Sequence, residues 1–156
     1  MVLAKIVHIL TSQISHRPKR SGERAYVQII NGGGCYSSVG RMGRKQDLSL
    51  ASRGCTSEGT VAHEFIHAIG FHHEQNRPDR DKYVKINWHN IRGRMKHNFE
   101  IQRGSKTFNV KYDGRSIMHY FSTAFGGSRN TIEAKPVSKF LRLEVFLGFF
   151  KFTNDW

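Results

Sequence analysis

Four of the nine histidines in this 156-residue sequence lie between positions 63 and 73, in the stretch TVAHEFIHAIGFHHEQ. On a helix, His63 and His67 stand one turn apart on the same face, so both imidazoles can bind a single metal ion. Glu64 lies about 100° further around the helix, where its carboxylate can reach a water molecule on the metal. The spacing therefore indicates a metal site with an acid–base group beside it.

A third ligand requires the chain to bend, because a straight helix would carry its next turn away from the metal. Gly70 follows His67 by three residues, and glycine permits the positive φ of a sharp helix end. The bend brings His73 back towards the ion, whereas His72 points elsewhere and is expected to be no ligand. Three imidazoles leave a fourth position open for water, which is the arrangement of a catalytic zinc ion.

The extended motif is far more specific than the short one. Three fixed residues would arise at a given position on the order of once in 10⁴, and adding Gly70 and His73 lowers this to the order of 10⁻⁶. The alternative is a helix whose histidines are ordinary surface or core groups, but it must also explain Glu64 and the glycine. We predict one catalytic Zn²⁺ bound by His63, His67 and His73.

These residues need a helix with a defined end, and the sequence from 56 to 69 predicts one. Thr56 or Ser57 can cap it, Glu58 lies in its first turn, and Gly70 stops it. Other elements are predicted from alternation or turn residues: strands at 25–30 and 47–52, amphipathic helical turns at 4–14, a short helix ending at Phe99, and turns and loops at 112–127.

Composition and charge narrow the class of protein. Lysine and arginine number 25 against 12 acidic residues, a net charge of +13. This favours a solvated basic surface, with heparin-like polymers or anionic matrix as possible contacts. The basic residues form no long block interleaved with aromatic residues, so no specific nucleic-acid partner is predicted. No apolar run reaches the ~18 residues of a membrane span, and the N-terminal stretch, interrupted by Lys5 and His8, is no convincing signal peptide.

The sequence has two cysteines, Cys35 and Cys55, and no C-x-x-C pair. A thiolate zinc site is therefore not indicated. Two cysteines can form one disulfide, which would imply an oxidising compartment. The length is that of a single domain, residues 1–156.

The stretch HEFIHAIGFHHEQ resembles the zinc signature of the astacin family of metalloendopeptidases, within the metzincin clan. Glu74, after the third histidine, is the mark of astacins among metzincins. The similarity extends over residues 22–135 and includes these stretches: GERAYVQIINGGGCYSSVGR (22–41), LSLASRGCTSEGTVAHE (48–64), QNRPDRDKYVKINWHNI (75–91) and YDGRSIMHY (112–120). The ends, 1–21 and 139–156, diverge from the family pattern, and both cysteines of the family's second disulfide are absent.

The resemblance implies an α+β, zincin-like catalytic domain. Its upper subdomain, about 22–73, would hold a twisted mixed sheet and the active-site helix above the cleft. Its lower subdomain, 74–135, would be irregular and contain the Met-turn.

The resemblance also implies roles for single residues. Met118 would be the Met-turn residue beneath the imidazoles. Tyr120 would be a possible additional metal ligand that donates a hydrogen bond to the developing oxyanion. Glu74 would be a structural support. Cys35 and Cys55 would form a disulfide, and the segment Leu48, Ser49 and Leu50 would be an edge strand that pairs with extended substrate.

The function that follows is hydrolysis of peptide bonds in protein or peptide substrates by a secreted zinc endopeptidase. Glu64 would act as general base and then as general acid. Two alternatives remain: an inactive or unstable fragment that binds zinc without turnover, and a basic module that binds polyanions.

Overall fold

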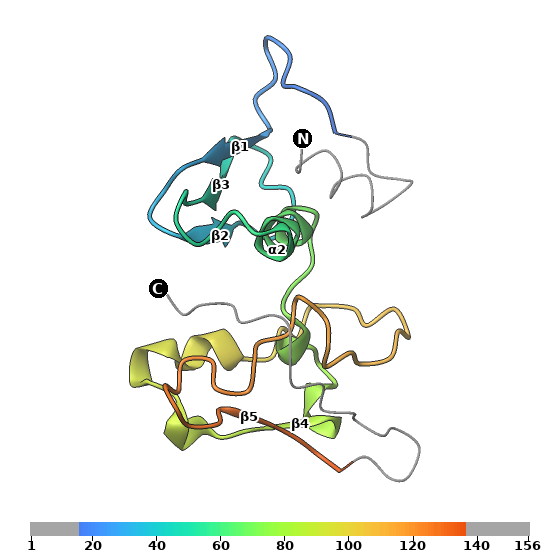
Figure 1. The fold of residues 1–156 in the computed structure, drawn as a ribbon. Coiled ribbons are helices and arrows are strands. Elements are labelled where there is room, and N and C mark those ends of the chain that lie inside the picture. Colours follow the sequence, from blue (N-terminus) through green and yellow to red (C-terminus); the bar gives the residue numbers. More distant parts are fainter. Residues whose placement is uncertain (1–15, 137–156) are drawn as a thin grey trace. The chain divides into compact units, whose positions relative to one another are not determined.

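A computed structural model describes residues 16–136 (Figure 1). The chain divides into two compact units, with the boundary between Phe71 and His72. The helical turns predicted at 4–14 and the divergent tail from 139 lie outside the described residues. Among the described residues, no helix is long and apolar enough to cross a membrane.

The first unit contains a three-stranded mixed sheet in the order β1-β3-β2. β1 (Val27–Ile30) runs parallel to β3 (Gln46–Leu50), and β2 (Cys35–Ser37) runs antiparallel to it (Figure 1). β1 and β3 are the two predicted strands, and the mixed sheet confirms the predicted fold class. β2 was not predicted, because three residues directly after a glycine run carry no readable alternation.

The position of β3 overturns one prediction. Leu48, Ser49 and Leu50 were expected on an edge strand, yet β3 lies between β1 and β2 and is paired on both sides. Leu48 and Ser49 are each 0% exposed. A strand whose backbone groups are already bonded on both sides cannot accept a substrate strand. The prediction rested on the resemblance alone, and the pairing of β3 on both sides excludes it.

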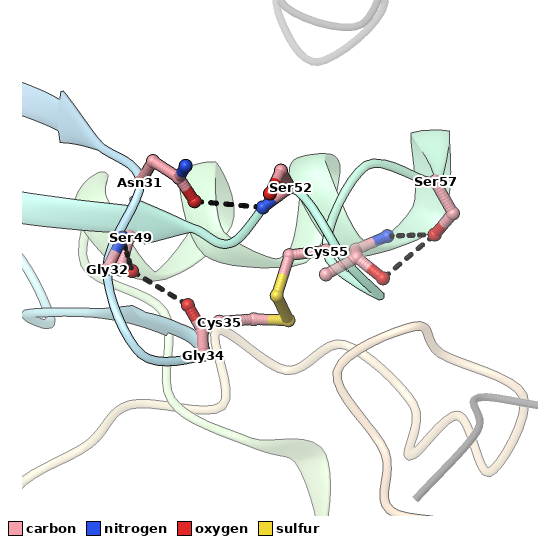
Figure 2. The surroundings of a disulfide bond; sticks show 9 residues. Asn31, Gly32, Gly34, Cys35, Ser49, Ser52, Cys55 and Ser57 are labelled. Carbon is pink, nitrogen blue, oxygen red and sulfur yellow. Dashed lines mark hydrogen bonds between the residues drawn. A yellow bond between two sulfur atoms is a disulfide. The ribbon is translucent and has the colours of Figure 1, made fainter. Parts of the chain in front are cut away.

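The predicted disulfide joins Cys35 to Cys55, with 5.6 Å between their Cα atoms. Beside it, Ser49 Oγ donates a hydrogen bond to Gly34 O at 2.7 Å and accepts one from Gly32 N at 3.2 Å (Figure 2). A Cβ atom at position 32 would lie 2.6 Å from Ser49 Oγ, so the close approach requires glycine there. These bonds fix the β1–β2 connection against β3.

α2 (Glu58–Ala68) packs against β2 and β3 in the same unit. Its N-cap is Ser57, whose Oγ accepts a hydrogen bond from Thr60 N at 3.2 Å. The buried residues follow the three-to-four-residue spacing of one helix face: Thr60, Val61, Glu64 and His67. The face that anchors the helix therefore includes two residues of the predicted site.

The described part of the second unit, residues 72–136, has little regular structure. It contains four 3₁₀ helices and a two-stranded antiparallel sheet: η1 (Glu74–Asn76), η2 (Arg80–Lys82), β4 (Val84–Ile86), η3 (Trp88–Asn90), η4 (Gly93–Phe99) and β5 (Ile132–Ala134). The helix predicted to end at Phe99 is thus a 3₁₀ helix. Phe99 is fully buried in an apolar cluster formed with Val84, Ile86, Ile91, Ala124 and Ile132.

Candidate metal centre

The structure brings together the three histidines singled out by their spacing. One ring nitrogen from each of His63, His67 and His73 lies within 4.8 Å of the other two. Imidazoles that bind one zinc ion tetrahedrally at about 2.1 Å have nitrogens about 3.4 Å apart, so the observed grouping is close to the spacing that zinc requires. The rings of His63 and His67 are 4.6 Å apart and nearly perpendicular. Their positions one helix turn apart account for this proximity.

The end of α2 sets the direction of the chain towards the third histidine. Gly70 N donates to His67 O at 2.9 Å, and Phe71 N donates to Ile66 O at 3.2 Å. This pair of bonds is the Schellman motif, which requires a residue of positive φ at the position that Gly70 occupies. The φ of Gly70 is +114°. A residue with a Cβ atom would be strained there, so the glycine has the structural role that its position predicts.

The orientation of the His67 ring is set by a backbone carbonyl. His67 is buried, and its Nδ1 lies 2.8 Å from Phe71 O. A carbonyl oxygen only accepts, so Nδ1 carries the hydrogen and Nε2 keeps its lone pair for a metal ion. The glycine bend places Phe71 O within reach, so the same turn positions the chain and selects the tautomer.

Glu64 is a buried carboxylate with an uncommitted oxygen. It is 4% exposed, and its Oε2 has no hydrogen-bond partner within residues 16–136. Burial raises the pKa of Glu64 to about 7. A buried carboxylate without a partner is costly, and such groups are concentrated at functional sites. This carboxylate, adjacent to His63 in sequence, suits an acid–base group beside a bound cation.

His72 and His73 have different environments, as predicted from their alternation. His72 is exposed and does not belong to the histidine cluster. His73 is partly buried, and its ring centroid lies 4.5 Å from that of Tyr120. The Tyr120 ring also contacts Phe99 and Phe125, with centroids 5.7 and 5.4 Å away. Tyr120 therefore lies between His73 and the apolar cluster of the second unit.

Glu74 holds three segments of the second unit together. Its backbone N donates to Met118 O at 2.9 Å. Its Oε1 accepts hydrogen bonds from Arg77 Nη1 at 2.9 Å and from Asp113 N at 2.8 Å. Met118 is buried, and its N donates to Ser116 Oγ. These contacts fit the supporting roles predicted for Glu74 and Met118, although they do not test a role in catalysis.

Sequence reasoning missed two buried polar residues, Gln75 and Arg80. Gln75 is 0% exposed, and its Oε1 accepts a hydrogen bond from Tyr120 N at 3.0 Å. Arg80 is also buried and donates to Gln75 O and Phe99 O. Hydrophobic periodicity cannot reveal such residues. The available signal was indirect: an irregular segment needs side chains to pair its buried backbone groups.

His119 is held between a backbone carbonyl and a tyrosine hydroxyl. Its Nδ1 lies 2.6 Å from Tyr120 O, and its Nε2 lies 2.6 Å from Tyr112 Oη. The carbonyl requires a hydrogen on Nδ1, so Nε2 accepts from the Tyr112 hydroxyl. Burial lowers the pKa of His119 and raises the pKa of Tyr112. Both groups are therefore neutral at pH 7 and fix the backbone of Tyr120.

Comparisons with known proteins agree with the geometry. The model of the astacin peptidase family matches residues 7–143. Zinc metalloproteinase nas-6 of Caenorhabditis elegans is 48% identical over 118 residues, covering 74% of this chain and 34% of that protein. Meprin A subunit beta of Rattus norvegicus is 47% identical over 119 residues, covering 74% of this chain and 17% of that protein. The chain thus spans only part of the length of these relatives.

A solved structure shows the same fold. High choriolytic enzyme 1, a hatching enzyme zinc-protease from the medaka Oryzias latipes, matches with a TM-score of 0.78 and 36% sequence identity. The match covers 88% of this chain and 70% of that chain.

Proposed function

Because the chain belongs to the astacin family of peptidases, we propose that it is a zinc-dependent endopeptidase. One observation carries the proposal: three histidine nitrogens converge within 4.8 Å, and Glu64, the residue after His63, is buried with an oxygen that has no hydrogen-bond partner among the described residues. The zinc metalloproteinases among the relatives support the choice of metal.

The donor set fits zinc in particular. Imidazole nitrogens are common zinc ligands, and three of them leave a position open for water or substrate. Bound there, zinc would lower the pKa of a water molecule to about 7 and polarise a peptide carbonyl. The hydrogen bond from His67 Nδ1 to Phe71 O keeps one ligand in the required tautomer before any metal arrives.

Glu64 is the proposed proton carrier. Its carboxylate accepts the proton of the attacking water and then delivers that proton to the amine that leaves when the peptide bond breaks. Burial by itself raises the pKa of the Glu64 carboxyl, which strengthens it as a base, whereas a bound cation would act in the opposite direction.

Tyr120 and Met118 complete the proposed site. A neutral phenol can donate a hydrogen bond to the oxyanion that forms on the scissile carbonyl. The Tyr120 ring is held beside His73, which supports this role. Met118 is buried two residues earlier and is proposed as the apolar floor of the Met-turn.

We place the substrate-pairing strand at β2 in place of the predicted segment 48–50. Among the described residues, β2 bonds to β3 on one side, which leaves the backbone groups of its other side for an extended peptide. The helix with His63 and His67 packs against β2 in the same unit. The Cys35–Cys55 disulfide supports a secreted or extracellular location.

Zinc analysis combined with a mixed peptide library tests the proposal. We expect one zinc ion per chain and cleavage that falls about 10²–10⁴-fold in Glu64→Ala. Glu58→Ala is the matched control, since Glu58 lies in the first turn of the same helix and is exposed. Stoichiometric zinc with no cleavage by the unmodified chain would contradict the enzyme and favour a zinc-binding protein without turnover.

A further inference from the structure

We propose that Gln75 is a positioning residue that holds Tyr120 in place beside His73. The inference rests on the proposed endopeptidase function, in which Tyr120 donates to the oxyanion. Gln75 follows His73 by two residues and touches no reacting atom in this scheme. Its contribution would be to fix where the tyrosine stands.

Two of the hydrogen bonds that join the segment after His73 to the segment 112–120 lie close to Tyr120 in sequence. Glu74 N donates to Met118 O at 2.9 Å, and Tyr120 N donates to the Gln75 side chain Oε1 at 3.0 Å. The first bond uses backbone groups and survives most substitutions. The second depends on a side chain of the other segment, so Gln75 is a residue at which the attachment of Tyr120 to that segment can be changed.

The Gln75 side chain is itself held firmly. It is 0% exposed, and its Nε2 donates to Asn76 Oδ1 at 3.1 Å. Asn76 Nδ2 in turn donates to Asn98 O and Glu100 O, at 2.9 and 2.6 Å. A buried network with every member paired is rigid, so the Gln75 acceptor has little freedom to move with Tyr120.

Arg80 fixes the same residue from its backbone side. Its Nη1 donates to Gln75 O at 2.9 Å and to Phe99 O at 2.7 Å. Phe99 is fully buried and packs edge-to-face with the Tyr120 ring. Gln75 and the apolar surface beneath Tyr120 are therefore fastened to one guanidinium group, and the tyrosine is held at both its backbone and its ring.

Loss of the Gln75 Oε1 acceptor should lower the catalytic rate more than it weakens substrate binding. A displacement of about 1 Å at a group that acts in the transition state can cost about 10²-fold in rate. Substrate affinity in the ground state depends on other contacts, including the proposed strand pairing at β2. The metal ligands also keep their own positions, so zinc content should not change.

Gln75→Met tests the inference, because methionine has a similar length and no comparable acceptor. The matched control is Thr131→Val in the same unit. Thr131 is also 0% exposed, and its hydroxyl donates to Ser122 O and Ala124 O. Both variants lose buried hydrogen bonds, but only Gln75→Met loses one to Tyr120.

Amide hydrogen exchange gives a readout that needs no turnover. In Gln75→Met we expect exchange of the Tyr120 amide to accelerate about tenfold or more, with no such change in Thr131→Val. Unchanged Tyr120 exchange in Gln75→Met would overturn the inference. If that variant does not fold, Gln75→Asn withdraws the acceptor by one methylene and should change exchange in the same direction.

Kinetics supply the second readout. We expect kcat to fall about 10- to 100-fold in Gln75→Met with KM changed less than threefold, and kcat to be retained in Thr131→Val. In a Tyr120→Phe background, Gln75→Met should cost less than threefold, because the group it positions is gone. An equal loss in both backgrounds would overturn the inference. If the unmodified chain cleaves no peptide, the proposed function fails, and the exchange experiment alone decides the role of Gln75.

Discussion

The two compact units hold their polar site residues in place by different means. The first unit uses a mixed sheet and a helix (Figure 1), together with a helix cap and a disulfide. The second unit, with short 3₁₀ helices and one small sheet, relies on buried polar side chains such as Gln75, Asn76 and Arg80. Repetitive backbone bonding satisfies its own polar groups, whereas an irregular chain needs side chains for that task.

The largest expected loss of stability comes from a substitution in the apolar cluster of the second unit. It tests whether this cluster stabilises the unit as much as the polar network does. Phe99→Ala should lower the free energy of unfolding by about 3–5 kcal/mol, because it opens a cavity at a fully buried aromatic residue. Denaturant unfolding measures the loss. Trp88→Ala is the control, since Trp88 is 40% exposed and contacts Phe99 from outside the core. A loss below about 1 kcal/mol would show that the polar network alone supports this unit.

The disulfide is the corresponding test in the first unit. Replacing both Cys35 and Cys55 by serine should lower the free energy of unfolding by about 3 kcal/mol, because the bridge closes a loop of 20 residues. Hydrogen exchange should show the loss at β2 and β3, the strands next to the bridge. An unchanged unfolding free energy would mean that the sheet and helix suffice, and the contrast between the units would then be sharper.

A smaller loss in the free energy of unfolding is expected from a substitution at the end of α2. Gly70→Ala places a Cβ atom at a φ of +114°, and should cost about 1–2 kcal/mol in the free energy of unfolding. Zinc affinity should fall as well, because the same turn carries the acceptor for His67. Gly33→Ala serves as the control, since a Cβ atom there meets nothing within 4 Å. Equal effects of both substitutions would contradict a special role for Gly70.

The same contrast explains how much could be predicted from the sequence. The predicted helix 56–69 and strands 25–30 and 47–52 correspond to α2, β1 and β3, and the buried residues of α2 show the periodic pattern of one helix face. β2 was too short for a readable pattern, and the edge strand was misplaced because the resemblance was carried over to residues 48–50. Gln75 and Arg80 were not predicted, because pairing between distant segments leaves no periodic trace.

The candidate site was easier to predict than the unit that supports it. The histidine spacing and Gly70 follow from helix geometry, and the structure shows the converging ring nitrogens and the Schellman turn. The Cys35–Cys55 bridge was predicted through the resemblance and is confirmed. The roles of Glu64, Met118 and Tyr120 remain predictions, because their positions are consistent with catalysis but do not measure it.

The central claim is that His63, His67 and His73 bind the metal ion and that the neighbouring His72 does not. Zinc stoichiometry by competitive titration of four single alanine variants tests it most directly, with His72→Ala as the matched control. We expect His72→Ala to bind one zinc ion per chain with the affinity of the unmodified protein. Each of the other three variants should lose at least tenfold in affinity, because two imidazoles do not complete the site. A His72→Ala variant that loses zinc, or a His73→Ala variant that retains full affinity, would contradict the account.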